Sequence, residues 1–222
     1  MQYTPEIRNN LIIGTIPVEL FEIPTSNSID VISFSENLLL GTIPSTIGNL
    51  VNAIGIDLAL NQLTGNIPTE IGLLSELETL YLRHNELRYV EEGFSYIHAN
   101  TKANLFTVTS LQPIISLLSV VSGAMPSEIG NCEQLETLSV HFNKLQGTIP
   151  PQLFAGPIRR SMEVLVVSHN MLSGTLPQEA MIEATNLLVF RVDFNQLSGT
   201  IPTTVNHMTN LGKQLRVVVL HR

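Results

Sequence analysis

The stretch Asn195–Pro202, NQLSGTIP, decides the fold, because near-copies of it recur along the chain. The other copies stand at Asn10–Pro17, Asn37–Pro44, Asn61–Pro68, Asn143–Pro150 and Asn170–Pro177. Self-similarity at a period of about 20–50 residues indicates a solenoid, in which each unit buries its apolar face against its neighbours. Such proteins usually present a surface to a partner, so the sequence predicts shape better than it predicts the partner.

The spacing between the glycines of successive copies gives the length of one unit. The interval from Gly41 to Gly65 recurs from Gly123 to Gly147, but the interval from Gly65 to Gly123 is more than twice as long. This gap is too long for one unit, and we expect it to hold a unit that ends at Tyr89, in place of glycine. A degenerate repeat and an insertion are then expected around residues 90–122.

An apolar ladder precedes each glycine and predicts one short strand per unit. In the clearest unit the ladder is formed by Leu74, Leu77, Leu80, Leu82, Asn85 and Leu87. Its L-x-L step alternates between a buried and an exposed face, as a half-buried strand does. The asparagine leaves the strand at a tight bend, where its amide can satisfy buried backbone groups. A structural column is therefore expected at Asn10, Asn37, Asn61, Asn85, Asn143, Asn170 and Asn195.

The pattern L-x-x-L-x-x-L-x-L-x-x-N-x-L-x-G-x-I-P resembles leucine-rich repeats of the plant type, which occur in receptor-kinase ectodomains and polygalacturonase inhibitors. Ile129–Pro150, IGNCEQLETLSVHFNKLQGTIP, is especially similar to those receptors. The resemblance implies an α/β fold, a right-handed horseshoe with one parallel inner sheet. About eight to nine repeats and a low helix content are expected. It implies little about function, because binding sites are grafted onto folds.

Composition is consistent with a single solenoid domain over residues 1–222. The formal charge is −8 and there is no basic run, which makes nucleic acid an unsuitable partner. Ala103–Ser127 has no charged side chain, but its polar residues and repeat spacing favour a degenerate repeat over a membrane helix. We therefore expect no membrane span in this chain.

The sequence contains one cysteine, Cys132, so it has no disulfide pair. Cys132 stands in an apolar slot of the ladder, where a buried thiol is expected rather than a nucleophile. The sequence also shows no signal peptide and no N-x-[ST] sequon. An extracellular or membrane-tethered location is implied only by the resemblance.

Motifs that carry catalysis are missing from the sequence. It contains no G-x-S-x-G, H-E-x-x-H or G-x-G-x-x-G, and its six histidines do not recur at metal-ligand spacing. We expect neither a catalytic residue, a cofactor nor a metal, and we expect the protein not to be an enzyme.

The candidate site is the exposed side of the inner, concave sheet. Aromatic, imidazole and charged residues occupy the strand slots that point away from the core, and such residues favour interfaces. Phe142, His169 and Phe194 fall in one column on successive coils, flanked by His141, Arg191 and Asp193. The remaining candidate ligand-binding residues are Ser139 and a second cluster formed by Tyr81, Arg83 and His84.

These residues predict a non-enzymatic binding module that takes a protein, a peptide or an oligosaccharide on its concave face. By resemblance it is the recognition part of a receptor-like or secreted protein. If His141 and His169 contact the ligand, affinity is expected to change near pH 6–7, where an ordinary imidazole titrates. The alternative is a structural spacer or scaffold without a specific ligand.

Overall fold

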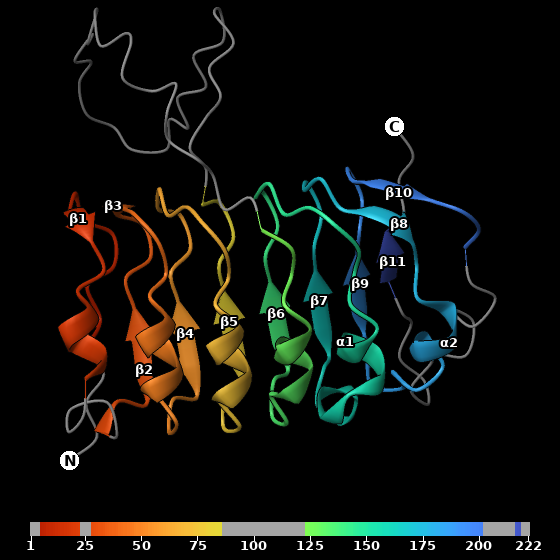
Figure 1. Cartoon of the computed structure of the whole chain (residues 1–222), viewed down its shortest axis with the longest axis horizontal. Helices are drawn as coiled ribbons and strands as arrows, with labels where there is room; N and C mark the ends of the chain where they lie inside the picture. Colours follow the sequence, from red (N-terminus) through yellow and green to blue (C-terminus); the bar gives the residue numbers. More distant parts are fainter. Residues whose placement is uncertain (1–4, 23–27, 86–122, 202–215, 219–222) are drawn as a thin grey trace, which may run out of the picture.

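The structure is a computed structural model that describes residues 5–22, 28–85, 123–201 and 216–218. The chain winds into a row of coils, and each coil gives one short strand to a common sheet (Figure 1). The strands stand side by side along the long axis, and short helices line their lower ends in this view. The predicted architecture of a parallel sheet with low helix content is confirmed.

The main sheet has seven parallel strands in the order β2-β4-β5-β6-β7-β9-β11. An eighth coil joins it at the N-terminal end through a parallel bridge between Glu6 and Ser33. The strands are β2 Val31–Ser33, β4 Gly55–Asp57, β5 Thr79–Tyr81, β6 Thr137–Ser139, β7 Val164–Val166, β9 Val189–Arg191 and β11 Arg216–Val218. They pair without any shift in register, which stacks equivalent residues of successive coils in straight rows.

Two small sheets form where each coil turns away from the main sheet. Both are parallel pairs built from the N-x-L-x-G phrase. They comprise β1 Ile13–Thr15 with β3 Leu38–Leu40, and β8 Ser173–Thr175 with β10 Gln196–Ser198. The positive φ of the repeat glycines, 78° at Gly65 and Gly174, explains why glycine stands at this turn.

The opposite side of each coil is a short helix that follows the proline of the phrase. Proline has no backbone N–H to donate, but none is needed directly before the first turn of a helix. The proline therefore marks the boundary between the glycine turn and the helix that follows. The helices are η1 Val18–Phe21, η3 Ser45–Asn49, η4 Thr69–Leu73, η6 Ser127–Asn131, α1 Gln152–Ala155, η7 Pro157–Arg160 and α2 Gln178–Met181. Within the described ranges, no helix is long and apolar enough to cross a membrane.

The core is a stack of aliphatic layers between the main sheet and the helices. The middle residues of β4, β5, β6 and β7 point inward, and these residues, Ile56, Leu80, Leu138 and Leu165, are at most 1% exposed. Cys132 fills one of these apolar slots at 0% exposure, and its thiol donates to the carbonyl of Ile71 at 3.2 Å. Burial raises the pKa of the Cys132 thiol to about 12, and the expectation of a buried thiol is confirmed.

The predicted asparagine column is present and joins each coil to the one before it. The amide nitrogen of Asn61 donates to Phe34 O of the preceding coil at 2.9 Å, and its Oδ1 accepts Leu39 N at 3.0 Å. The same two contacts recur around Asn170, with Val140 O and Leu145 N, both at 3.0 Å. The first asparagine of the series, Asn10, is different: it is exposed and donates to Arg8 O.

The long gap before Gly123 is an insertion into one coil. β5 pairs directly with β6, Thr79 opposite Thr137, so no strand stands between them. In neighbouring coils the glycine lies against the residue after the preceding glycine, as Gly65 does against Thr42. Gly123 lies in the same way against Asn66, which makes it the glycine that directly follows Gly65.

This arrangement corrects the expected place of one unit and leaves the expected number of repeats unchanged. Asn85 and Gly123 belong to one coil, and the segment 86–122 stands where the tripeptide Gln-Leu-Thr joins Asn61 to Gly65. A separate unit ending at Tyr89, and a degenerate repeat standing in the sheet before β6, are therefore wrong. The spacing misled because apolar residues inside the gap also fit the ladder. The segment 86–122 itself, with most of Ala103–Ser127, lies outside the described residues.

We predict that the asparagines contribute unequally to stability. Replacing Asn61 by Ala leaves the backbone groups of Phe34 and Leu39 without their side-chain partners, which should cost about 1–3 kcal/mol of unfolding free energy. Asn143 still donates to Leu82 O at 3.0 Å, but its buried Oδ1 has no partner among the described residues. Asn143→Ala should therefore cost less than Asn61→Ala in urea unfolding, and equal losses would contradict this account of the column.

We also predict that the inserted segment is dispensable for the solenoid. Replacing residues 86–122 by Gln-Leu-Thr, the tripeptide that follows Asn61, restores the normal spacing between Asn85 and Gly123. The variant should keep its circular dichroism spectrum and unfold at the same or a higher temperature, because a shorter loop costs less closure entropy. Loss of cooperative unfolding would show that the segment supplies part of the core.

Candidate ligand-binding face

The sheet face is the side of the main sheet that points away from the core. On it, register aligns Asp57, Tyr81, Ser139, Val166 and Arg191 in one row across five strands. A second row, two residues later in each coil, runs through Ala59, Arg83, His141, Ser168 and Asp193. All the predicted site residues lie in these two rows or directly beside them.

A column of four stacked rings borders this face where the strands end. The ring column consists of His84, Phe142, His169 and Phe194. Its neighbouring ring centroids are 4.3, 4.0 and 4.1 Å apart, with planes inclined by 16°, 11° and 13°. The predicted alignment of Phe142, His169 and Phe194 is confirmed, and His84 extends it by one coil. Stacked aromatic pairs contribute roughly 0.5–1.5 kcal/mol beyond their buried area.

The backbone of the coil places these rings. Each ring residue has a left-handed conformation, with φ between 52° and 54°. Glu36 and Leu60 occupy the same place in earlier coils at φ 58° and 56°, so the conformation belongs to the coil and not to the ring. Bulky residues rarely adopt it, and the cost is of the order of 1–3 kcal/mol each. Successive side chains consequently leave the chain in one direction and stack.

The two predicted clusters lie next to one another on the sheet face. His84 stacks on Phe142 and meets His141 edge to face, with ring centroids 5.4 Å apart. The backbone N–H of His84 also donates to His141 O at 3.0 Å. Tyr81 and Arg83 thus stand next to Ser139 and His141, because β5 and β6 are direct neighbours across the insertion.

Two of the predicted contact residues are buried and act on their neighbours. Ser139 is 5% exposed, and its hydroxyl lies 2.9 Å from Nδ1 of His141. Asp193 is 3% exposed and accepts a hydrogen bond from the hydroxyl of Ser168 at 2.6 Å. The same carboxylate oxygen lies 3.7 Å from Nε of the exposed Arg191. These contacts orient His141 and Arg191, so Ser139 and Asp193 support the face rather than cover it.

Sequence reasoning missed two contributions to this face. Ser168 is the partner that holds Asp193, and it could have been recognised because it fills the same slot one coil earlier. Val164, Val166 and Val189 are half-buried on the face and make the region beside Arg191 apolar. They escaped notice because valine in a strand is usually interpreted as core.

The electrostatic surroundings of His141 differ from the expectation. Burial, followed by the neighbouring His84, Arg83, Arg191 and His169, lowers the pKa of His141 to about 4. Each of these causes disfavours the imidazolium ion. The expected change in affinity near pH 6–7 therefore cannot come from His141, which is already neutral there. The sequence shows the imidazole but not the cations that surround it.

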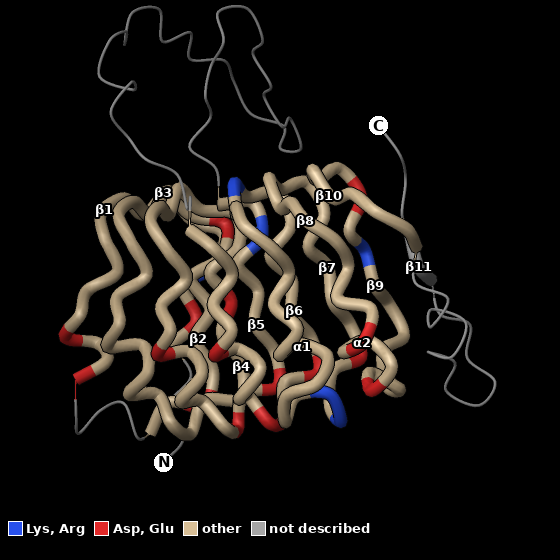
Figure 2. Tube along the Cα trace, turned by 45° about the vertical axis from the view of Figure 1, so that its right-hand side comes forward, with Lys and Arg blue, Asp and Glu red and all other residues tan. Residues whose placement is uncertain are grey.

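Charge is unevenly distributed over the molecule. Figure 2 shows Asp and Glu gathered mainly along the lower edge, where the strands begin, with Lys and Arg mostly higher up. Glu78, Glu136 and Glu163, all exposed, occupy equivalent places before β5, β6 and β7. The sheet face thus runs from an acidic edge to an edge that carries imidazoles and guanidinium groups.

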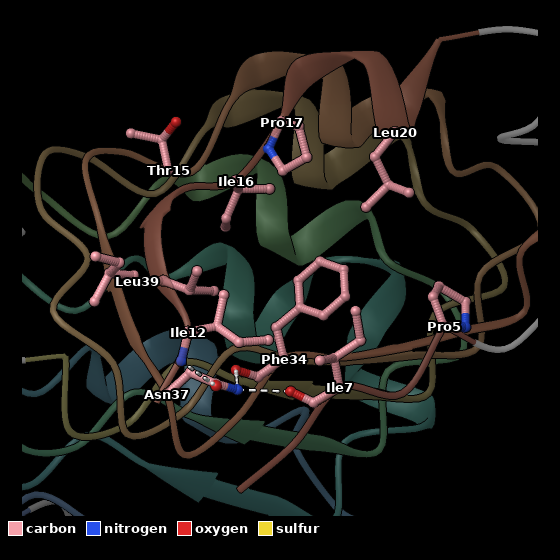
Figure 3. A pocket seen from close by; sticks show the side chains of 11 residues that line it. Pro5, Ile7, Ile12, Thr15, Ile16, Pro17, Leu20, Phe34, Asn37 and Leu39 are labelled. Carbon is pink, nitrogen blue, oxygen red and sulfur yellow. Dashed lines mark hydrogen bonds between the residues drawn. The ribbon is translucent and has the colours of Figure 1, made fainter. Parts of the chain in front are cut away.

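A separate cavity of about 390 Å³ opens at the N-terminal end of the core (Figure 3). Its lining is apolar apart from Thr15 and Asn37, and it includes Ile7, Ile12 and Phe34. The amide of Asn37 is already engaged, donating to Ile7 O at 2.6 Å and accepting from Ile12 N at 3.2 Å. The cavity is part of the core end and lies away from the ring column.

Metal-ligand clusters are absent from the part of the chain that the structure describes. No group of three or more His, Cys, Asp or Glu side chains comes together there in a way that could hold a metal ion. The sheet face offers stacked rings, oriented cations and small hydroxyl residues, which suit binding.

Comparison with known proteins agrees with this description. The family model of the Leucine Rich Repeat matches residues 134–155. Receptor-like protein 18 of Arabidopsis thaliana is 29% identical over 210 residues, covering 87% of this chain and 24% of that protein. Phytosulfokine receptor 1 of Arabidopsis thaliana is 31% identical over 149 residues, covering 67% of this chain and 14% of the receptor.

Solved structures show the same fold. The plant peptide hormone receptor RGFR1 in complex with RGF2 matches with a TM-score of 0.74 and 26% identity, over 98% of this chain and 28% of the receptor chain. The ectodomain of the Arabidopsis receptor kinase HAESA, solved with an IDA peptide hormone, matches with a TM-score of 0.67 and 26% identity. That match covers 90% of this chain and 27% of the HAESA chain.

The chain spans about a quarter or less of the curated relatives named above, 24% and 14% of their lengths. The chain therefore belongs to the leucine-rich-repeat family, and it is similar to plant receptor-like proteins and to plant receptor ectodomains.

Proposed function

We propose that this chain is a non-enzymatic recognition module that binds a peptide or an extended protein segment across its sheet face. The observation that carries the proposal is the ring column, which continues across the insertion without a break. It makes a continuous rim of four coils beside a sheet face on which Tyr81, Arg83 and Arg191 stand among smaller residues. An extended ligand lying across the strands would meet one new side chain about every 4.8 Å.

The chemistry of the face favours a peptide over other partners. Tyr81, Arg83 and Arg191 are the residue types that contribute most to protein interfaces. Phe194 is 52% exposed at the end of the ring column, where it presents an apolar surface to a partner. Relatives by fold have been solved with peptide hormones bound, RGF2 on RGFR1 and an IDA peptide on HAESA.

A pair of matched variants tests the binding face. Phe194→Ala removes an exposed ring from the column, whereas Leu73→Ala removes an apolar side chain that is 63% exposed on the helix side. We predict that synthetic peptides selected from a random library on the wild-type chain bind Phe194→Ala more weakly by about 1–2 kcal/mol, the cost of truncating an aromatic anchor. Leu73→Ala should bind them as the wild type does.

Equal binding of those peptides by both variants in calorimetry would place the site elsewhere. Failure of a library of high diversity to yield any peptide would instead favour the spacer interpretation. Thermal unfolding of both variants serves as the control for folding, since neither side chain belongs to the buried core.

The lowered pKa of His141 leads to a separate prediction about stability. In the unfolded chain an imidazole has a pKa of about 6.5, whereas in the folded protein the pKa of His141 is about 4. Between these values the unfolded state binds more protons, so stability falls as the pH is lowered from about 6.5 to 4. The unfolding free energy of His141→Gln should decline less over this range, and an identical decline in urea titrations would contradict the lowered pKa.

A further inference from the structure

Two coils carry an apolar patch on the lateral side of the solenoid. This lateral patch consists of Leu11, Ile13, Leu38 and Leu40, which are 82%, 74%, 37% and 38% exposed. Parallel pairing places Ile13 of β1 directly beside Leu38 of β3, and Leu40 follows on the same face of β3, since Leu39 between them is buried. The patch belongs to the two-stranded sheet of β1 and β3, which stands apart from the main sheet and its ring column (Figure 1).

The repeat does not require apolar residues in these places. The phrase N-x-L-x-G has one outward slot before its central aliphatic residue and one after it. In later copies of the phrase the two slots are polar apart from Met171, and they hold Gln62 and Thr64, Lys144 and Gln146, Met171 and Ser173, and Gln196 and Ser198. The four aliphatic side chains of the lateral patch therefore serve something other than the coil itself.

The apolar cavity adjoins the lateral patch. Ile13 and Thr15 are part of its lining, together with Ile7 and Ile12, which are themselves 45% and 40% exposed (Figure 3). Leu11 precedes Ile12 in the chain, and most of its surface is exposed. Patch and cavity thus form one apolar area that has both a projecting side chain and a recess of about 390 Å³.

The border of the lateral patch is neutral. Thr15 pairs with Leu40, and the N–H of Gln62 donates to Leu39 O at 2.8 Å on the other side of β3. The patch itself has no charged side chain, so no charge in it selects a partner of opposite sign. An uncharged surface with a projection and a recess can match a second copy of itself.

The exposed area is large enough for such a contact. The patch and the two exposed cavity residues together expose more than three complete aliphatic residues. This corresponds to the largest apolar patch of a typical monomer, about 300–600 Å², and such patches mark interaction sites. Two copies would bury twice that area, and a polar rim would extend it toward the roughly 1,200–2,000 Å² of a stable complex.

We propose that the lateral patch is a contact between two copies of this chain, related by a two-fold axis. The same residues then face one another from both sides. Leu11 of each copy enters the apolar cavity of the other, while Ile13 and Leu38 pack against the second copy. This inference goes beyond the proposed peptide binding and does not depend on it, because the ring column takes no part in the contact.

Sedimentation of the whole chain over a range of concentrations tests the contact. We predict a reversible equilibrium between monomer and dimer that stops at the dimer, because a two-fold contact is closed. Sodium sulfate should shift this equilibrium toward the dimer. It screens the repulsion between two chains that each carry a formal charge of −8, and it strengthens the burial of apolar surface.

Variants can be taken from the slots of later coils, which accept polar residues. Ile13→Thr and Leu38→Gln bring in the residue types that stand at Thr64 and Gln62. Each should raise the dissociation constant of the dimer at least about tenfold, because each change removes apolar surface from both sides of the contact. Met171→Gln makes the matched change in a later coil, at a side chain that is 38% exposed, and should leave the constant unchanged. Thermal unfolding of each variant is the control for folding.

A chain that remains monomeric up to about 1 mM, where even a weak complex forms, overturns the proposal. A dimer that Ile13→Thr, Leu38→Gln and Met171→Gln weaken equally also overturns it, because the contact then lies elsewhere. Association that continues beyond the dimer would point to an open, head-to-tail contact instead. In a monomer, a Leu11→Cys thiol in the Cys132→Ala chain that resists maleimide would show that the chain covers its own patch.

Discussion

The asparagine column is the interaction on which the rest of the structure depends. Each buried amide satisfies backbone groups of its own coil and of the coil before it, at the bend where the strand ends. Without it, every bend would bury carbonyl and N–H groups that have no partner, at a cost of about 1–3 kcal/mol for each group. Because the column is continuous from Asn37 to Asn195, the strands keep one register, and equivalent side chains stand in straight rows.

The binding face is a direct consequence of that register. Side chains that would be scattered in a globular protein are brought together by one slot per coil, as in the ring column. The insertion before Gly123 does not interrupt this order, since Asn143 donates to Leu82 O as other asparagines do to their preceding coil. The Oδ1 atom of Asn143, however, has no hydrogen-bond partner among the described residues. Continuity of the face thus comes with a local weakness in the column.

Much of the fold was predictable because its determinants are local and periodic. The glycine, the asparagine and the L-x-L step each have a backbone reason to recur, and all three were found where expected except at Asn10 and in the gap before Gly123. The gap before Gly123 was misjudged because a period counts residues and does not tell one coil with an insertion from two coils. Leu87 and the apolar residues after it fit the ladder as well as true core positions do. Only the pairing of Thr79 with Thr137 distinguishes the two arrangements.

The sequence predicts which positions of the candidate site lie on the outer face of the sheet, but not how exposed each residue is or what it contacts. Position in the coil places Phe142, His169 and Phe194 in a column, and the structure confirms it. Exposure depends on neighbours that are remote in sequence, so the burial of Asp193 by Ser168 was not evident. The state of His141 depends on the same kind of neighbour, because Arg83 and Arg191 belong to other coils and lie far from it along the chain.

The central claim is that the coils on either side of the insertion are direct neighbours, so that the face is one surface. A disulfide between Thr79→Cys and Thr137→Cys, in a chain that also carries Cys132→Ala, tests it most directly. Paired residues on adjacent strands lie about 4.8 Å apart, within the range of roughly 4.4–6.8 Å that a disulfide requires. The account predicts rapid, nearly complete cross-linking of the folded chain under mild oxidation. Absence of the cross-link would contradict it, since an intervening strand would separate the two positions by about 9.6 Å.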